Sequence, residues 1–255
     1  MVIESIPKVV GMAYAIVATL VIVLLLRSGR FNKRIGYLFL GVSALLGFLV
    51  FAPMLPYQFQ SVLLGNTAQL GVPIAAAIAV LALFVVLSFV FGRVFCGYVC
   101  PVGAVQELVY HIPVKKMRIT SKTVTIVFRL LFLVAFVLLA LGFSVGLLGY
   151  LGIRDFFYLN FASGFFYVFL TLMIISIVVY RPSCRFFCPY GALLSLATLR
   201  GRFKTRRNEN CNYCEDCVSA CPTNEAGETD LKQECYMCNR CKEACPLDAI
   251  EYSTK

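Results

Sequence analysis

Residues 211–222 read CNYCEDCVSACP, and residues 235–246 read CYMCNRCKEACP. Both stretches carry the spacing C-x2-C-x2-C-x3-C-P, which is typical of segments that bind a pair of [4Fe–4S] clusters. Thiolates are soft ligands of the kind that hold iron–sulfur clusters. The segment 205–255 is therefore predicted to be a small α+β domain built around two such clusters.

Each run supplies three closely spaced ligands to one cluster and a fourth ligand to the other, as in two-cluster ferredoxins of the bacterial type. The predicted ligands are Cys211, Cys214, Cys217 and Cys245 for cluster 1, and Cys235, Cys238, Cys241 and Cys221 for cluster 2. A zinc site is the alternative, although zinc sites usually join two C-x2-C halves across a longer gap. A domain of about 50 residues depends on such a metal to fold.

The rest of the chain has the composition of a membrane protein. Of the 255 residues, 60% are hydrophobic, and the mean hydropathy is +0.83. Residues 1–204 hold seventeen Lys and Arg against three Asp and Glu, whereas residues 205–255 hold six against ten. The basic excess thus belongs to the membrane part, where it indicates topology and not nucleic-acid binding. The single histidine, His111, excludes a haem held by two histidines of this chain.

Five apolar runs are long enough to cross the roughly 30 Å hydrocarbon core of a bilayer. They lie near residues 9–26, 35–53, 71–92, 124–147 and 161–180. The first run has no A-x-A-type cleavage site and is followed at once by four basic residues. We therefore expect it to be a membrane helix and not a signal peptide.

Positive charges predict the orientation of these helices. Segments 27–34 and 93–123 are rich in Lys and Arg, whereas segments 54–70 and 148–160 are not. The positive-inside rule places the first two segments in the cytoplasm and the other two outside. With five helices in the cytoplasmic (inner) membrane, we expect the N-terminus outside and the cysteine-rich domain in the cytoplasm. All twelve cysteines have ligand-like spacings, which agrees with a reducing compartment.

The membrane part contains an internal repeat at an offset of 88 residues, with the pattern R-x2-C-x3-C-P-x-G-A. Each copy follows two predicted helices, so both copies enter the membrane in the same direction, as parallel repeats do. The segments after the motifs, 104–111 and 192–199, are predicted to be short helices at the cytoplasmic interface. Residues 203–210 are predicted to be a polar tether. The repeated residues are Arg93, Cys96, Cys100, Pro101, Gly103 and Ala104, and Arg181, Cys184, Cys188, Pro189, Gly191 and Ala192.

The two C-x3-CP motifs form a candidate site for a further cluster or metal. Side chains at i and i+4 share one face of a helix, so the two cysteines of each motif can point together. The repeat symmetry would bring four thiols to one site, where the two repeated arginines offset thiolate charge. The alternative is that the motifs are helix-ending turns with buried, inert thiols, and that the arginines mark the interface. The candidate ligands are Cys96, Cys100, Cys184 and Cys188.

Three further features have two interpretations each. His111 is either a proton acceptor for a quinol or a surface histidine. Arg129 lies inside the fourth apolar run, where it is either functional or snorkels to the interface. An aromatic cluster is either an interfacial belt or part of the wall of a quinone pocket. It consists of Phe156, Phe157, Tyr158 and Phe161.

Paired C-x3-CP motifs followed by two ferredoxin motifs resemble the membrane polyferredoxins of the NapH, NosR and CcoG type, over residues 35–250. The resemblance implies an electron conduit between the quinone pool, or a soluble cytoplasmic donor, and a partner enzyme. For NapH-like members it implies quinol oxidation that feeds a reductase outside the cytoplasm. The chain departs from the NosR pattern because these residues include no S/T-G-A-T flavin-attachment motif and no flavin-binding domain.

We therefore expect a membrane-bound electron-transfer subunit of an oxidoreductase complex, similar to a quinol dehydrogenase, whose chemistry is one-electron transfer. Its expected partners are the membrane, other redox subunits or a reductase, and a soluble ferredoxin or flavoprotein donor. The alternative, which the resemblance to CcoG implies, is a maturation factor that handles metal for a metalloenzyme. A third interpretation is a membrane anchor in which the clusters only connect other subunits.

Overall fold

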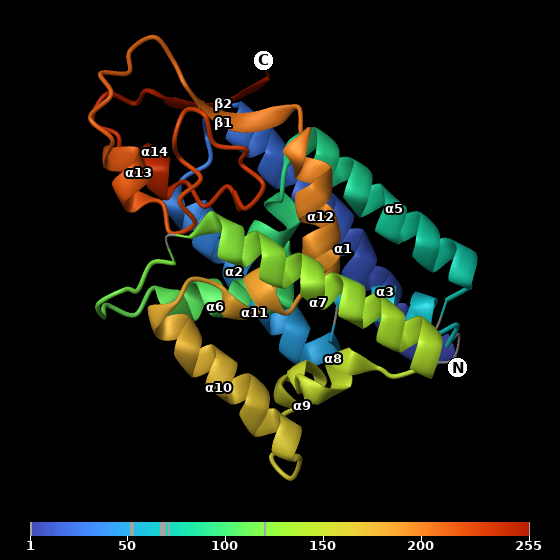
Figure 1. Ribbon diagram of the computed structural model, residues 1–255. Helices are drawn as coiled ribbons and strands as arrows, with labels where there is room; N and C mark the ends of the chain where they lie inside the picture. Colours follow the sequence, from blue (N-terminus) through green and yellow to red (C-terminus); the bar gives the residue numbers. More distant parts are fainter. Residues whose placement is uncertain (1, 52–53, 67–69, 71, 120, 255) are drawn as a thin grey trace.

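The computed structural model describes residues 2–51, 54–66, 70, 72–119 and 121–254. Within these residues the chain is a bundle of helices that carries a C-terminal lobe with a small two-stranded sheet (Figure 1). The prediction of a mainly helical chain is therefore confirmed. Parts of two predicted spans, at residues 52–53 and 71, lie outside the described residues.

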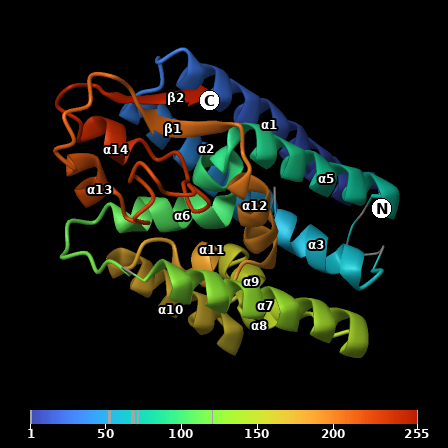
Figure 2. The ribbon, with the colours of Figure 1, turned by 45° about the horizontal axis from the view of Figure 1, so that its top comes forward.

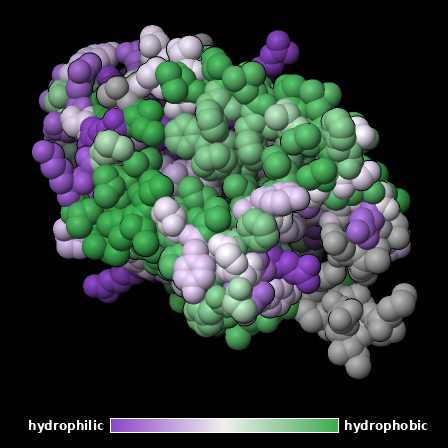
Figure 3. Space-filling model, turned by 60° about the horizontal axis from the view of Figure 1, so that its bottom comes forward, coloured by the Kyte–Doolittle hydropathy of each residue, from purple (hydrophilic) through white to green (hydrophobic). Residues whose placement is uncertain are grey.

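Four helices are long and apolar enough to cross a membrane. They are α1 (Val2–Arg27), α2 (Lys33–Val50), α5 (Ile74–Phe91) and α7 (Lys122–Phe143). Many of their apolar side chains point outward, and Leu49 and Phe143 are 70% and 77% exposed. Figure 3 shows hydrophobic side chains over most of one face of the molecule. Because this surface would be costly in water and suits lipid, the helices indicate a membrane protein.

The fifth predicted span, near residues 161–180, contains the shorter apolar helix α10 (Gly164–Val178), which has 15 residues. A helix of this length extends about 22 Å, which is less than the hydrocarbon core of a bilayer. The helix ends early because the chain becomes extended at Val179. There, the Val178 carbonyl accepts a hydrogen bond from Met117 N–H at 3.0 Å. The count of five spans stays a prediction.

Three short helices close the end of the bundle that lies away from the lobe (Figure 1). They are α3 (Leu55–Leu63), α8 (Leu147–Tyr150) and α9 (Ile153–Phe157). Side chains of α3 bind the backbone of α8: Gln60 accepts from Leu148 N–H at 2.8 Å, and the Tyr57 hydroxyl donates to the Leu148 carbonyl at 2.9 Å. The first turn of α8 is thereby fixed against α3.

The predicted aromatic cluster divides into an inner and an outer pair. Phe157 is 1% exposed, and its ring centroid lies 4.8 Å from that of Phe48. Phe156 also faces inward. The other two rings, Tyr158 and Phe161, are 54% and 60% exposed. Only this outer pair can therefore belong to an interfacial belt, because the inner pair fills the core.

The sequence predicted that the helices after the two cysteine motifs lie at the cytoplasmic interface. In the structure, they are packed inside the bundle. α6 (Pro101–Tyr110) lies against α2 and α10, and α12 (Pro189–Leu199) lies against α5, α7 and α3 (Figure 2). Ala104 of α6 and Leu194 of α12 are fully buried. Both helices are packed among other helices of the bundle and not laid on its outside, and their position at the cytoplasmic membrane interface stays a prediction. The short π-helical η1 (Phe95–Val99) and the helix α11 (Pro182–Phe186) precede them.

The C-terminal lobe begins with β1 (Phe203–Arg207), which pairs antiparallel with β2 (Ile250–Thr254). The first half of the predicted tether is therefore a strand, because β2 satisfies its backbone and Phe203 stacks on Tyr252 with ring centroids 5.5 Å apart. Between the strands lie α13 (Asp216–Ala220) and α14 (Arg240–Glu243). Both views show this lobe seated on the bundle beside α6 (Figures 1 and 2).

Candidate functional site

Each C-x3-CP motif forms the same local corner. Its second cysteine, Cys100 or Cys188, caps the N-terminus of the following helix, and a proline occupies the first turn. Proline suits this position because its missing N–H has no partner in a helix and its φ angle is already helical. In the second motif, the Cys188 sulfur accepts a hydrogen bond from Gly191 N–H at 3.2 Å. Both thiols thus lie at the positive end of a helix dipole.

The four thiols of the two motifs lie within electrostatic reach of one another. Cys100 interacts with Cys96 and Cys184. Cys188 interacts with Cys96 and Cys100. Burial, reinforced by these neighbours, raises the pKa of Cys188 to about 12. A thiolate at this site therefore needs a bound cation to stabilise its charge.

The donor set fits an iron–sulfur group. Four soft sulfur atoms and the N-termini of α6 and α12 meet at one place, and both features favour a thiolate-bound, anionic cluster. Across the described part of the chain, no three His, Cys, Asp or Glu side chains stand close enough to hold a single metal ion. A cluster has its iron atoms at separate corners, so its ligands stand farther apart than those of one ion.

In the lobe, the predicted ligands of cluster 2 surround one pocket. Cys235, Cys238 and Cys241 of the second motif line it together with Cys221, the last cysteine of the first motif. Burial raises the pKa of Cys235 to about 12, and the nearby thiols of Cys238 and Cys221 contribute to the rise. This grouping is the one that the interleaved spacing predicts, although the ligand assignment itself stays a prediction.

The predicted ligands of cluster 1 are less enclosed. Cys217 and Cys245 belong to one small buried cluster. Cys217 and Cys211 both interact with the guanidinium of Arg207, whose Nη2 lies 3.6 Å from the Cys217 sulfur. Cys214 is exposed to solvent. The first motif therefore faces the outside of the lobe, whereas the second motif faces the bundle.

The two lobe motifs share one backbone conformation. Left-handed φ angles occur at Tyr213 (58°) and Glu215 (64°) of the first motif. They recur at the equivalent residues of the second motif, Met237 (55°) and Asn239 (61°). Turns of this kind direct successive N–H groups toward one centre and form the concave sites that hold iron–sulfur clusters. The backbone of the lobe therefore fits the predicted cofactors.

The last cysteines of the two motifs also have matching partners. The Cys221 sulfur accepts a hydrogen bond from Glu225 N–H, and the Cys245 sulfur accepts one from Ala249 N–H, both at 3.3 Å. Hydrogen bonds to ligand sulfur lower its negative charge and are one of the means by which a protein sets a cluster potential.

The loop of the second lobe motif lies directly on the first C-x3-CP motif. A Cβ atom added to Gly97 would stand 2.3 Å from the carbonyl oxygen of Tyr236. The Tyr98 hydroxyl donates a hydrogen bond to the Met237 carbonyl at 3.0 Å. Tyr236 is 2% exposed. The predicted cluster 2 site and the C-x3-CP site are thus separated by little more than one buried ring.

A buried carboxylate of the lobe is also paired with the bundle. Glu234 lies 2.9 Å from Arg129 of α7 and 3.0 Å from Arg185 of α11. All three side chains are at most 5% exposed. Arg129 therefore does not snorkel to the interface, because it is held inside by the acidic residue that precedes Cys235.

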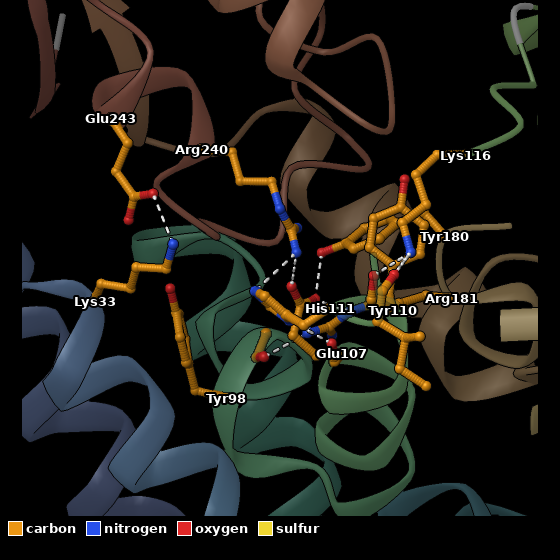
Figure 4. Close-up of polar contacts among 12 residues, drawn as sticks. Lys33, Tyr98, Glu107, Tyr110, His111, Lys116, Tyr180, Arg181, Arg240 and Glu243 are labelled. Atoms are coloured by element: carbon orange, nitrogen blue, oxygen red, sulfur yellow. Dashed lines mark hydrogen bonds and ion pairs between the residues drawn. The ribbon is translucent and has the colours of Figure 1, made fainter. Parts of the chain in front are cut away.

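A second buried carboxylate, Glu107 of α6, joins the two repeats and the lobe (Figure 4). It forms ion pairs with Arg181 of the second motif, at 2.7 Å, and with Arg240 of α14. The Tyr180 hydroxyl donates to it at 2.7 Å. Burial alone would raise the pKa of Glu107, but the two arginines outweigh this effect and lower it to about 2. The side chain is therefore ionised at neutral pH.

His111 lies at the end of α6 and lines a cavity of about 390 Å³ between α2 and the lobe. Its Nδ1 stands 2.7 Å from the Glu107 carbonyl oxygen, which fixes the proton on Nδ1. Its Nε2 faces Arg240 Nη2 at 3.4 Å (Figure 4). Cys238, a predicted ligand of cluster 2, lines the same cavity. The histidine is exposed, as expected for a surface histidine, and it also lines this cavity.

Comparison with known proteins identifies the family. A family described as a 4Fe-4S binding domain matches residues 73–120 and 163–208, and each match contains one C-x3-CP motif. The chain is 32% identical over 173 residues to the uncharacterized protein MJ0750 of Methanocaldococcus jannaschii, which covers 63% of this chain and 68% of that protein. It belongs to the membrane polyferredoxin family. The predicted family is thereby confirmed, and the chain is a member of an iron–sulfur electron-transport family.

Two further relatives place this polyferredoxin among longer proteins. It is 28% identical over 194 residues to the putative electron transport protein YccM of Escherichia coli, over 69% of this chain and 53% of that protein. It is 29% identical over 148 residues to the regulatory protein NosR of Stutzerimonas stutzeri, over 51% of this chain and 20% of that protein. The chain thus spans about half of the length of the E. coli relative and a fifth of the length of NosR. No solved structure matches it.

Three residues at the junction were not found from the sequence. Glu107 had a usable signal, because it is one of three acidic residues among residues 1–204. Glu234 and Tyr236 had none, because a polar and an aromatic residue beside a cysteine are common in any exposed metal loop. Only the docking of the lobe on the bundle gives them partners.

Proposed function

We propose that this polyferredoxin is an electron-transfer subunit that connects a cytoplasmic donor or the quinone pool with a partner redox enzyme. The observation that supports this most directly is the contact between the Cys235–Cys238 loop and the C-x3-CP motif, through Gly97 and Tyr236. When bound, the iron–sulfur clusters supply one-electron transfer. The protein supplies burial, hydrogen bonds to sulfur and a short separation between the sites.

The proposed ligand sets follow the two lobe motifs. Cluster 2 would be held by the four cysteines that line the inner pocket, and cluster 1 by the more exposed set that includes Cys214. The third site would be held by the four C-x3-CP thiols. Support for the third site comes from its two helix N-termini, and from a family described as a 4Fe-4S binding domain that matches the C-x3-CP segments themselves.

Iron content tests the number of cofactors. After anaerobic purification, we expect about ten to twelve irons per chain, and about eight when the four C-x3-CP cysteines are replaced by alanine. A matched variant, Cys238→Ser, removes a ligand of cluster 2 and is expected to lose about four irons while keeping the third site. Equal iron in the wild-type and the four-site variant would contradict a third iron cofactor.

A metal-handling role is the second candidate, and one observation favours it. Cys100, Cys184 and Cys188 line a narrow apolar pocket together with Phe169 and Phe187, on the side away from the lobe. Such a pocket offers a route to the thiols that does not pass through the lobe. Copper or another metal bound at this site in place of iron, with the lobe clusters intact, would favour a maturation factor over an electron relay.

The cavity beside His111 is our proposed quinol site. Tyr37 and Leu40 of α2, with Phe31 just before this helix, supply an apolar wall, and His111 lines the cavity with its Nε2 3.4 Å from Arg240 Nη2. A quinol headgroup there would lie beside Cys238 and could lose a proton to the imidazole. We expect His111→Leu to slow cluster reduction by a quinol at least tenfold while reduction by dithionite is unchanged. An unchanged quinol rate would remove this site.

We also propose that the lobe is cytoplasmic and that α1 begins on the outer side of the inner membrane. The basic segment after α1 supports this orientation, and α1 starts at the end of the bundle remote from the lobe (Figure 1). Protease applied to the outside of intact cells is expected to leave the lobe uncut, whereas inverted vesicles expose it.

A further inference from the structure

The arginines of the two repeats are exchanged between them. Arg181, from the second repeat, lies over Gly103 of the first, where an added Cβ would stand 3.0 Å from its Nη1. Arg93, from the first repeat, lies over Gly191 of the second, where an added Cβ would stand 3.1 Å from its Nη2. Both side chains are at most 1% exposed. Each guanidinium thus occupies the same position relative to the opposite motif.

The positive charges of Arg181 and Arg93 nevertheless have different partners. Glu107 lies one helical turn after Gly103 and pairs with Arg181 at 2.7 Å. The repeat offset of 88 residues places Ser195 where Glu107 would recur. The Ser195 hydroxyl donates to the Ala192 carbonyl at 2.8 Å and brings no negative charge. The second repeat therefore offers no carboxylate to Arg93, the arginine of the first repeat that lies over its Gly191.

Arg93 is left without a full set of partners. Among the described residues, its Nε and Nη1 atoms have no hydrogen-bond acceptor. Its Nη2 lies 4.0 Å from the Cys96 sulfur, and the guanidinium lies 4.5 Å from the ring centroid of Tyr236. The carboxylate that acts on it, Glu234, already faces two other arginines. A fully buried cation with so few partners is costly unless an anion lies beside it.

We propose that Arg93 is the counter-charge of the C-x3-CP site, and that it makes the cofactor held there easier to reduce. The inference rests on the proposed cofactor at these thiols and says which residue sets its charge. An added electron makes a thiolate-bound cluster more negative, and an uncompensated positive charge nearby favours that state. Arg181 has a smaller effect because Glu107, which it shares with Arg240, offsets part of its charge.

Arg93 is expected to make the predicted cluster 2 easier to reduce as well, but by a smaller amount. Arg93 stacks on Tyr236, which lies between the ligands Cys235 and Cys238. The first lobe motif faces away from this junction, so cluster 1 serves as an internal reference. Arg93 is thus a positioning and charge-setting residue and not a ligand.

A pair of substitutions at one position isolates the charge. Ser195→Glu restores the carboxylate that the repeat lacks, and Ser195→Gln adds the same bulk without the charge. In redox titrations followed by EPR, we expect Ser195→Glu to shift the midpoint potential of the C-x3-CP cofactor to more negative values. Cluster 2 should shift less, cluster 1 should not shift, and Ser195→Gln should leave all potentials unchanged.

Changes at Arg93 itself provide the second measurement if a larger side chain at Ser195 prevents folding. Arg93→Gln should lower the same potentials, and Arg93→Lys should largely retain them. Equal potentials in the wild-type, Ser195→Glu and Arg93→Gln proteins would overturn the inference. Iron content separates this result from failure of the third site: with about eight irons per chain, no third iron cofactor exists, and the shift of cluster 2 alone then decides whether Arg93 acts on a cluster.

Discussion

Replacing Gly97 by alanine is expected to release the ferredoxin lobe from the bundle and to lower the iron content by about four atoms per chain. The added Cβ would stand 2.3 Å from the Tyr236 carbonyl oxygen, a distance that real contacts do not show. Backbone must move to relieve it, and the moving segment carries Cys235 and Cys238. The substitution therefore disturbs the predicted cluster 2 although Gly97 binds no metal.

The control for this variant is the same substitution at Gly41 of α2, where an added Cβ meets nothing within 4 Å. We expect Gly41→Ala to retain full iron content and a slightly higher stability, because alanine favours the helix. Iron and sulfide analysis, with limited proteolysis of the lobe, measures both effects. Full iron and an uncut lobe in Gly97→Ala would show that the lobe does not depend on this contact.

Features encoded by local sequence could be predicted. The spacing of the lobe cysteines predicted that Cys221 lies with the second motif, and these cysteines do line one pocket; their role as ligands stays a prediction. The first four apolar runs were recognised as helices because hydrophobic length is a property of one segment. The helices after the C-x3-CP motifs were predicted, but the two cysteines of each motif do not share one helix, because Cys100 and Cys188 have extended backbones at the N-caps of the following helices.

Features that depend on packing between distant segments could not be predicted. The burial of α6 and α12 depends on helices that surround them, and their own sequences resemble those of interface helices. The role of β1 depends on β2, more than 40 residues later. The two arginines of the repeat looked equivalent in sequence, and only the tertiary contacts show that one is paired with Glu107 and the other is not.

Two buried carboxylates hold the lobe, each between two arginines. In one contact, Glu234 of the lobe pairs with arginines of the bundle. In the other, Glu107 of the bundle pairs with Arg240 of the lobe. A charge buried in this way gives little net stability while it is paired, but removal of one partner leaves the others exposed to the full cost of desolvation. The position of the lobe on the bundle is therefore specific, and a single substitution in these ion pairs is expected to disturb it.

Glu107→Gln is accordingly expected to cost about 3–5 kcal/mol of stability, because it leaves Arg181 and Arg240 buried without a counter-charge. The variant keeps the size of the side chain, so the loss reports on charge and not on a cavity. Thermal unfolding in detergent at a fixed scan rate measures it. The matched control breaks the exposed pair between Lys33 and Glu243, which are 60% and 45% exposed.

The control variant, Glu243→Gln, should change stability by at most about 1 kcal/mol, since exposed ion pairs are screened by water. Removing Arg240 together with the Glu107 charge, as Arg240→Met with Glu107→Gln, should recover part of the loss, because one fewer buried cation is left unpaired. A Glu107→Gln protein as stable as the Glu243→Gln control would mean that water or another anion already compensates the two arginines. The lobe would then be held mainly by the backbone contact at Gly97.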